Sequence, residues 1–195
     1  MSRSDADRWD ARYAGRSHAP AAPPDALARP VDLADLVPTT GRALDVACGA
    51  GGQSLWLAER GLDVVAVDVS AEAVELTRRA TEGRPVDARV VDLDDGLPAG
   101  LGSFDVVVCQ RFRMPSSYAS FVERTRAGGL VVVTVLSTTG TDEPGPFHAP
   151  GGELASAFDR PDCTIVRHAE GDGEESVVVR VDRRPLVERR GTVER

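Results

Sequence analysis

The sequence predicts an α/β protein with a seven-stranded, mostly parallel sheet, helices on both faces and an antiparallel hairpin at its C-terminal end. Three observations support this prediction. Short apolar runs rich in valine alternate with helical patterns between residues 42 and 136. Closely spaced glycines follow the first of these runs at once. The last two runs, 163–168 and 176–181, lie on either side of a Gly-Asp-Gly turn, which is typical of a hairpin.

The stretch from 42 to 70 (RALDVACGAGGQSLWLAERGLDVVAVDVS) is the unit around which we expect the chain to be organised. It predicts a strand over Ala43–Ala47, a glycine loop, a helix over Gln53–Arg60 and a second strand over Val64–Val67. Gly61 is placed to end the helix with a left-handed cap. Asp68 ends the second strand. This order is that of the first βαβ unit of a nucleotide site.

The glycine loop and Asp68 together predict a ligand that contains a nucleoside. Glycine lets a tight turn pass close to a ligand, and the start of the helix offers free N–H groups. A carboxylate at the end of the second strand accepts hydrogen bonds from ribose hydroxyls. The spacing Gly49-x-Gly51-x-x-Ser54 matches the dinucleotide fingerprint weakly, so both dinucleotides and S-adenosylmethionine fit the layout.

Asp45 favours the second ligand class. A carboxylate four residues before Gly49 lies under the loop, where it would repel a pyrophosphate and attract an ammonium or sulfonium group. The strings LDVACGAG and VVAVDVS resemble the first two motifs of class I S-adenosylmethionine-dependent methyltransferases. The alternative for these acids is a local role, with Asp45 capping a turn and Asp68 at the surface.

The resemblance implies a Rossmann-like fold, S-adenosyl-L-methionine as cofactor and no metal. It is nearest to the small bacterial methyltransferases of the tellurite-resistance and thiopurine type, and it extends over residues 8–182. DLDDGLP resembles the family's adenine motif, although its acids also fit a solvated turn. The implied cofactor-binding positions are Asp45, Ala47, Gly49, Gly51, Gln53, Asp68, Val69, Asp92, Leu93 and Gln110.

Further elements are expected on both sides of the central unit. Ser70 is placed to cap a helix over Ala71–Ala80. The connection Gly96–Gly102 contains too many glycines for a normal helix, although a parallel crossover usually contains one. The remaining expected strands are 86–91, 104–109 and 130–136, and the remaining helices are 31–37, 116–126 and 153–158.

The N-terminal segment 1–30 is expected to form a lid and a linker. A helix over Asp5–Ala14 places Trp9 and Tyr13 on one face, and WDARYA resembles a segment that covers the site in the family. An aromatic ring over a sulfonium would gain cation–π attraction. The alternative is a helix that packs both aromatic rings permanently on the core. Residues 15–30 are rich in proline, alanine and glycine and predict a loop.

Candidates for the acceptor side follow the fourth strand, at the edge where ligands bind in open α/β sheets. Phe112 and Arg113 are candidate substrate residues, and Arg16, Arg111 and Arg113 are candidates for an anionic group. Family members often carry a histidine after this strand, and this sequence has none there. His18, His148 and Arg111 are therefore the catalytic candidates, while His168 lies in an expected strand and is interpreted as structural.

Composition limits the classes of partner. The net charge of −8 argues against nucleic acid, whose recognition requires a basic face. The three cysteines lack metal-ligand spacing and fit a reducing cytoplasm, and residues 1–20 do not resemble a signal peptide. No apolar run is long enough for a membrane span. We expect a monomer or homodimer that binds a small-molecule substrate.

The sequence thus predicts three parts: segment 1–30, a methyltransferase domain over 31–182 and a charged tail over 183–195. The predicted function is an S-adenosylmethionine-dependent methyltransferase of a small molecule with an oxygen, nitrogen, sulfur or metalloid acceptor. Methyl transfer requires alignment of a nucleophile more than an acid–base pair. A nicotinamide-dependent oxidoreductase and a non-catalytic regulator that binds S-adenosylmethionine are the alternatives.

Overall fold

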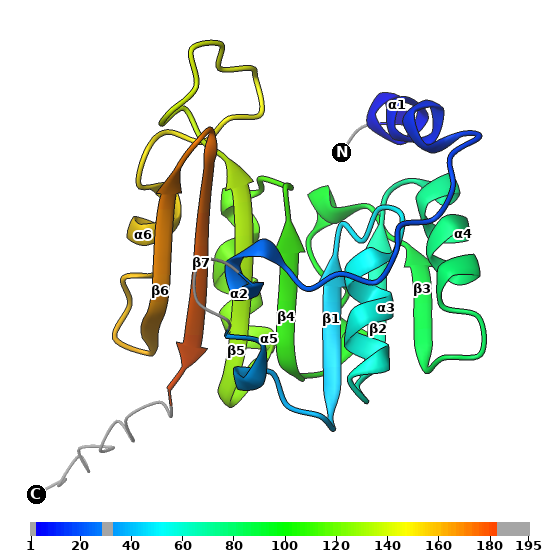
Figure 1. Ribbon diagram of the computed structural model, residues 1–195, viewed down its shortest axis with the longest axis horizontal. Helices are drawn as coiled ribbons and strands as arrows, with labels where there is room; N and C mark the ends of the chain where they lie inside the picture. The colour runs from blue at the N-terminus through cyan, green and yellow to red at the C-terminus, as the bar shows by residue number, and fades with distance from the viewer. Residues whose placement is uncertain (1–2, 29–32, 183–195) are drawn as a thin grey trace, which may run out of the picture.

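A computed structural model of the chain describes residues 3–28 and 33–182, and a single seven-stranded sheet runs through it in the order β3-β2-β1-β4-β5-β7-β6 (Figure 1). The strands are β1 (Arg42–Val46), β2 (Asp63–Asp68), β3 (Val86–Val90), β4 (Phe104–Gln110), β5 (Thr125–Leu136), β6 (Cys163–Gly171) and β7 (Glu174–Val181). The pairs among β1 to β5 are parallel, and β7 runs antiparallel to β5 and β6. The predicted fold class is confirmed.

Helices cover both faces of this sheet. They are α1 (Arg3–Tyr13), α2 (Asp25–Ala28), α3 (Gly52–Glu59), α4 (Ala71–Ala80), α5 (Tyr118–Arg124) and α6 (Glu153–Phe158). One core cluster joins the sheet to α5 and α6, and another joins the opposite face to α2 and α3. Helix α1 lies outside these layers, at the edge where the parallel strands end (Figure 1). None of the helices in the described ranges has both the length and the apolar character needed to cross a bilayer.

Strand alternation explains the two clusters. Leu44 and Val46 of β1 face the α5 side, while Ala43 faces the α3 side, and all three are buried. The parallel strands are buried on both faces, which explains their nearly continuous apolar sequence. Asp45 lies on the same face as Ala43, so its carboxylate is directed into the core on the side of α3.

Helix α4 begins as its sequence predicts. The Ser70 hydroxyl accepts a hydrogen bond from the N–H of Ala73 at 3.0 Å and satisfies one free donor of the first turn. The bounds of α4 and α6 are those expected from the sequence, and α3 lies one residue earlier than expected.

The linker before β1 differs from its prediction. The expected loop 15–30 contains the short helix α2, which buries Ala26 and Leu27 against the sheet. Of the expected helix 31–37, residues 31 and 32 lie outside the described ranges, and the rest forms only a 3-10 turn over Ala34–Leu36. Leu36 is exposed, so this turn lacks the apolar face that would fix a longer helix.

The segment around β5 also differs. Helix α5 ends at Arg124, and β5 begins at Thr125, where a strand irregularity lets Thr125 pair with Phe104 before Leu130 pairs with Val106. Gly128, with φ of +84°, accommodates the irregularity. The connection 93–102 holds two 3-10 turns, Leu93–Asp95 and Ala99–Leu101, and no α-helix, so its abbreviation is confirmed. The expected tail 183–195 lies outside the described residues.

Candidate functional site

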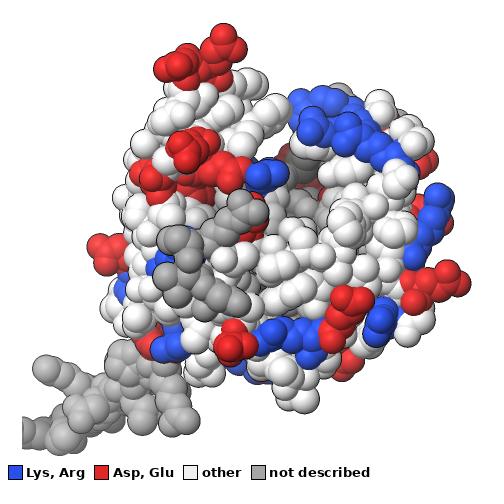
Figure 2. All heavy atoms as spheres, viewed as in Figure 1, with Lys and Arg blue, Asp and Glu red and all other residues white. Residues whose placement is uncertain are grey.

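A cavity of about 460 Å³ opens at the carboxyl ends of the parallel strands. Strand β1 lies between β2 and β4, so the strand order reverses at this point, where α/β sheets bind their ligands. The walls come from the glycine loop, the ends of β2 and β4, and helix α1 with the segment that follows it. Figure 2 shows the hollow on this face, with basic side chains of α1 on one side and acidic side chains on the other.

The glycine loop forms the floor of the cavity. Ala47 and Gly49 line it, with φ of +56° and +53°, so the chain turns sharply as it leaves β1. A Cβ atom at Gly49 would lie 2.7 Å from the hydroxyl oxygen of Tyr13. The absence of a side chain at Gly49 therefore lets α1 approach the loop closely.

Gly51 lies elsewhere. It does not line the cavity; a Cβ atom there would lie 2.9 Å from the Cα of Thr77 in α4. The interpretation of Gly51 as a cavity residue is therefore wrong in its geometry. This glycine, with φ of +84°, instead begins α3 and lets α4 pack against the loop.

Asp68 ends β2 at the cavity wall. Its carboxylate accepts the N–H of Gly49 at 3.0 Å and the N–H of Ser70 at 2.9 Å, and the residue is 6% exposed. Burial raises the pKa of Asp68, while these hydrogen bonds act in the opposite direction. A carboxylate with two backbone partners is held rigidly and has lone pairs left for a ligand.

Asp45 lies beneath the loop, outside the residues that line the cavity. Its carboxylate accepts the hydroxyl of Ser54 at 2.5 Å. Burial raises the pKa of Asp45 to about 7, with the nearby charge of Asp68 acting in the same direction. The attraction that we expect between Asp45 and a positively charged ligand group would thus act through the glycine loop, without direct contact.

Most of the other predicted cofactor positions meet at the cavity. Gln53, Val69, Leu93 and Gln110 line it. Asp92 does not: its side chain is exposed, and its carboxylate accepts the N–H of Asp94 at 3.0 Å and so caps the 3-10 turn there.

The N-terminal helix covers the cavity. Trp9 and Tyr13 line it and stack on one another with ring centroids 6.2 Å apart. The carboxylate of Asp10 accepts the hydroxyl of Ser70 at 2.6 Å and the N–H of Glu72 at 3.2 Å, which fixes α1 to the start of α4. Burial and the nearby Asp68 raise the pKa of the Tyr13 phenol, so this hydroxyl stays protonated at neutral pH.

The loop after β4 brings two of its three candidates into the cavity. Arg111 and Phe112 line it, and Arg111, with φ of +55°, is ion-paired with Glu174 at 2.6 Å. Arg113 does not line this cavity, and its guanidinium makes a two-point ion pair with Glu153 at 2.9 and 2.5 Å. Its expected role as a free anion-binding group is therefore not supported by its contacts.

The histidine and Arg16 candidates lie away from the cavity. His18 is exposed and contacts the carbonyl of Ala19, and the Nδ1 atom of His148 lies 2.9 Å from the N–H of Gly145. Neither lines the cavity, nor does the exposed Arg16. The loop that carries Arg16 and His18 borders the cavity through Ala22 and Pro23, but these two candidate side chains do not line it.

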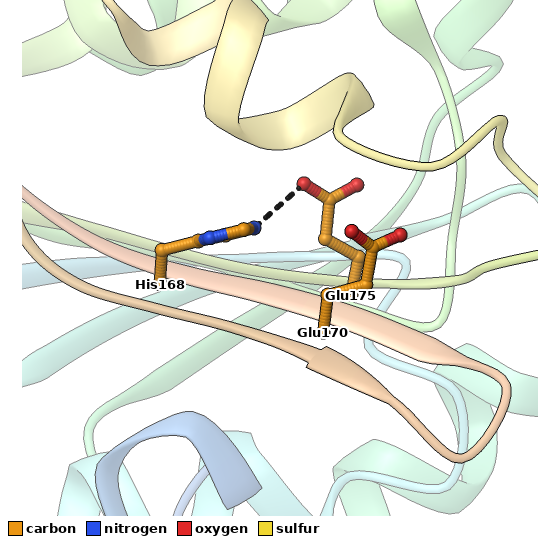
Figure 3. A group of neighbouring side chains, drawn as sticks. All are labelled: His168, Glu170 and Glu175. Atoms are coloured by element: carbon orange, nitrogen blue, oxygen red, sulfur yellow. Dashed lines mark hydrogen bonds and ion pairs between the residues drawn. The ribbon is translucent and has the colours of Figure 1, made fainter. Parts of the chain in front are cut away.

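His168 belongs to a polar cluster in the C-terminal hairpin. Figure 3 shows His168 and Glu175 directed toward one another, with Nε2 and Oε1 3.0 Å apart, and Glu170 beside them. Glu175 is fully buried and accepts the N–H groups of Leu154 and Ala155 at 3.0 Å each. The cluster therefore fixes the start of α6 to the hairpin, which agrees with a structural role for His168.

Seven further residues line the cavity that the sequence did not single out for it: Arg12, Ala22, Pro23, Asp25, Cys48, Ala50 and Thr134. Thr134 is 3% exposed, lies beside Gln110 in register, and its hydroxyl has no hydrogen-bond partner among the described residues. The only hydroxyl in the apolar run LVVVTVL was a usable signal for it. Asp25 reaches the cavity because it begins α2, a short helix in the segment predicted to be a loop.

Comparisons with known proteins agree with this geometry. Residues 43–127 match the family model of a methyltransferase domain. This part of the chain, from β1 to the start of β5, is therefore similar to methyltransferase domains.

Two relatives show how far the similarity extends along the chain. The ubiquinone biosynthesis O-methyltransferase of Xanthomonas axonopodis pv. citri (strain 306) is 38% identical over 113 residues, which cover 54% of this chain and 47% of that protein. The same enzyme of Xylella fastidiosa (strain 9a5c) is 32% identical, over 63% of this chain and 54% of its own. The chain therefore spans about half the length of these curated relatives.

Solved structures share the fold of this methyltransferase domain. TehB from Haemophilus influenzae superimposes with a TM-score of 0.63 at 19% identity, over 74% of this chain and 58% of its own. A structure concerned with conversion of a disulfide bond into a thioacetal group during echinomycin biosynthesis gives 0.66 at 22% identity, over 91% and 93%. An S-adenosylmethionine-dependent methyltransferase from Mesorhizobium loti gives 0.61 at 17% identity, over 75% and 94%. The expected fold is confirmed, and the match of residues 43–127 agrees with the expected methyltransferase family.

Proposed function

We propose that this protein transfers a methyl group from S-adenosyl-L-methionine to a small molecule. The observation that carries the proposal is the cavity itself, where a glycine loop and the buried carboxylate of Asp68 meet at the point of strand reversal. The relatives are O-methyltransferases, and the domain is shared with them.

The residues present fit this cofactor. Gly49 lines the cavity without a side chain, so its backbone is open to a ligand, and Asp68 offers a buried acceptor for ribose hydroxyls. Leu93 and Val69 offer apolar surface beside it for a base. Asp45 beneath the floor would favour a positively charged group above it.

Bound S-adenosylmethionine would supply a methyl group that is already activated for displacement. The work left to the chain is to hold the acceptor in line, to exclude water and to close the cavity. Helix α1 covers the cavity with Trp9 and Tyr13 and is held by Asp10, so it is suited to exclude water. A thiolate or amine acceptor needs no base, so this function does not require His18 or His148 to reach the site.

Two further assignments belong to this proposal. The cytoplasm is the expected compartment, since Cys48, Cys109 and Cys163 are all free thiols. The partner is a small molecule and not nucleic acid, since the chain carries a net charge of −8.

Calorimetry with S-adenosylhomocysteine and NAD tests the cofactor class. We expect S-adenosylhomocysteine to bind at least about 100-fold more tightly than NAD, because the carboxylate of Asp45 beneath the glycine loop disfavours a pyrophosphate. Tighter binding of NAD would favour the oxidoreductase alternative. Release of S-adenosylhomocysteine in a panel of phenol, thiol and amine acceptors then separates an enzyme from a regulator that only binds the cofactor.

A further inference from the structure

A second cavity of about 650 Å³ adjoins the first and shares four of its lining residues. It lies between α1, the loop after β4 and the loop after β5. The shared residues are Trp9, Arg12, Arg111 and Phe112. A molecule in the second cavity would therefore lie next to a cofactor in the first.

We propose that this second cavity is the acceptor pocket and that it selects a planar aromatic molecule carrying a carboxylate, which Arg12 binds. The inference rests on the proposed function, because an acceptor pocket has meaning only beside a methyl donor.

The walls of the second cavity fit an aromatic ring. Phe112, Met114, Leu136 and Phe147 line it together with Trp9. Phe147 is 51% exposed, which is unusual for a large aromatic side chain outside a binding surface. Flat apolar molecules gain both burial and ring stacking between such side chains.

The roof of the cavity is formed by contact between α1 and the loop after β5. The guanidinium of Arg8 lies 4.9 Å from the ring centroid of Phe147 and 5.5 Å from that of Trp9. Arg8 also pairs with Asp5 at 3.2 Å. Its charge is therefore already balanced, and its part in the roof is to bridge two aromatic rings.

Arg12 is the arginine whose charge is left for a ligand. Four arginines line the second cavity, and Arg111 and Arg113 are paired with Glu174 and Glu153, as Arg8 is with Asp5. Among the described residues Arg12 makes no ion pair, and its guanidinium lies 5.2 Å from the ring centroid of Trp9.

A hydrogen-bond donor of Trp9, beside Arg12, also lacks an acceptor among the described residues. This donor is the indole Nε1–H, which is buried. A buried donor without a partner is costly, and an entering oxyanion would relieve that cost after a small shift of α1. Both groups at the junction of the cavities therefore require an acceptor of hydrogen bonds with negative charge, which a carboxylate provides. The acids on the walls, Asp5, Asp94 and Glu174, oppose binding of an anion elsewhere in the pocket.

A matched pair of probes tests the inference. Binding of 3,4-dihydroxybenzoate and of 3,4-dihydroxybenzamide is measured by calorimetry on protein saturated with S-adenosylhomocysteine. We expect the acid to bind at least about tenfold more tightly than the amide, since a charge-assisted pair replaces a neutral one. Arg12→Gln should bring the ratio close to one, and Arg12→Lys should restore part of it. Arg79→Gln, which changes an exposed arginine of α4 outside both cavities, should leave the ratio unchanged.

Other results overturn the inference in distinguishable ways. Equal binding of acid and amide, failure of both to bind, or a preference that survives in Arg12→Gln contradicts an acceptor carboxylate at Arg12. If Arg12→Gln weakens S-adenosylhomocysteine but not 5′-deoxy-5′-methylthioadenosine, which lacks the amino-acid part, Arg12 binds the carboxylate of the cofactor instead. If S-adenosylhomocysteine does not bind wild-type protein at all, the proposed function itself fails, and the inference with it.

Discussion

Asp68 connects the second strand, the glycine loop and the cavity through a single carboxylate. It accepts two backbone N–H groups, which aim its remaining lone pairs and hold the loop at the end of β2. Its neighbours therefore determine both where it lies and what it can bind.

Replacing Asp68 with alanine should weaken S-adenosylhomocysteine roughly 10- to 100-fold, because a hydrogen bond to a charged group contributes about 1.5–3 kcal/mol. Calorimetry measures the change. Asp63→Ala, at the exposed start of the same strand, is the control and should bind as wild type does. Unchanged affinity in Asp68→Ala would remove this carboxylate from the site.

The two glycines of the loop should respond differently to the same substitution. Gly49→Ala brings a methyl group against Tyr13 at the cavity, so we expect weaker binding of S-adenosylhomocysteine with a small change in stability. Gly51→Ala brings a methyl group against the backbone of Thr77, so we expect a loss of about 1–3 kcal/mol in the free energy of unfolding. Urea unfolding and calorimetry on both variants check this, and the reverse pattern would contradict the geometry.

The sequence predicts the residues whose role follows from residue type and spacing within a motif. It does not predict the residues whose role depends on how distant elements pack. Asp68 and Gly49 lie at the cavity as their motif predicts. Gly51 belongs to the same motif, but its direction depends on where α4 packs, and no local pattern carries that information. The sequence does not single out Arg12, because its lack of an ion pair within the described ranges depends on the whole surrounding fold.

At the scale of elements, α1 lies over a ligand cavity and is held there by few contacts, among them Asp10 to the start of α4 and Arg8 to Phe147. Its contact through Asp10 is polar and half-buried, while Trp9 and Tyr13 are themselves only half-buried. Elements with few buried apolar contacts open at low free energy, so α1 is suited to open and close. The linker predictions failed here because α2 is four residues long and is stabilised by tertiary burial of Leu27, not by helix propensity.

Asp10→Ala should release this helix. We expect faster tryptic cleavage after Arg16 and a several-fold loss of S-adenosylhomocysteine affinity, since the lost hydrogen bond contributes about 1 kcal/mol. Mass spectrometry identifies the cleavage site, and calorimetry gives the affinity. Asp7→Ala, exposed on the same helix, is the matched control. Cleavage at the wild-type rate in Asp10→Ala would show that packing of the aromatic rings, not Asp10, holds α1.

At the scale of the molecule, the sheet was predictable because its strands are nearly pure apolar runs buried on both faces. The hairpin extends further than expected, since β6 reaches Gly171 and β7 begins at Glu174. Its polar residues face a buried cluster that no alternation pattern indicates, with Glu175 inside the core. The burial of Glu175, and with it the effect of this charge on stability, therefore could not be predicted from the sequence.

Stability should fall as the pH rises from about 4 to about 7 through the titration of Asp45. The folded protein holds this carboxyl's pKa at about 7, above the value of about 4 in the unfolded chain, so the folded state binds the extra proton within this window. The free energy of unfolding then decreases by up to about 1.4 kcal/mol per pH unit.

Urea unfolding of wild type and Asp45→Asn measures this dependence. Between about pH 5 and about pH 7.5 the variant should gain about 2 kcal/mol relative to wild type, because asparagine does not ionise. Parallel pH curves for the two proteins would show that Asp45 ionises freely in the folded state.

The hydroxyl of Ser70 serves two helices at once: it accepts the N–H of Ala73 at the start of α4 and donates to Asp10 of α1. Closure of α1 over the cavity and fraying of the first turn of α4 therefore both depend on this hydroxyl. By linkage, each of these equilibria shifts the other by the same free energy. Amide hydrogen exchange at Ala73 therefore reports whether α1 is closed, and we expect it to slow when a ligand occupies the cavity. The first turn of α4 thus reports the state of α1, whose Asp10 lies 60 residues before Ser70 in the chain.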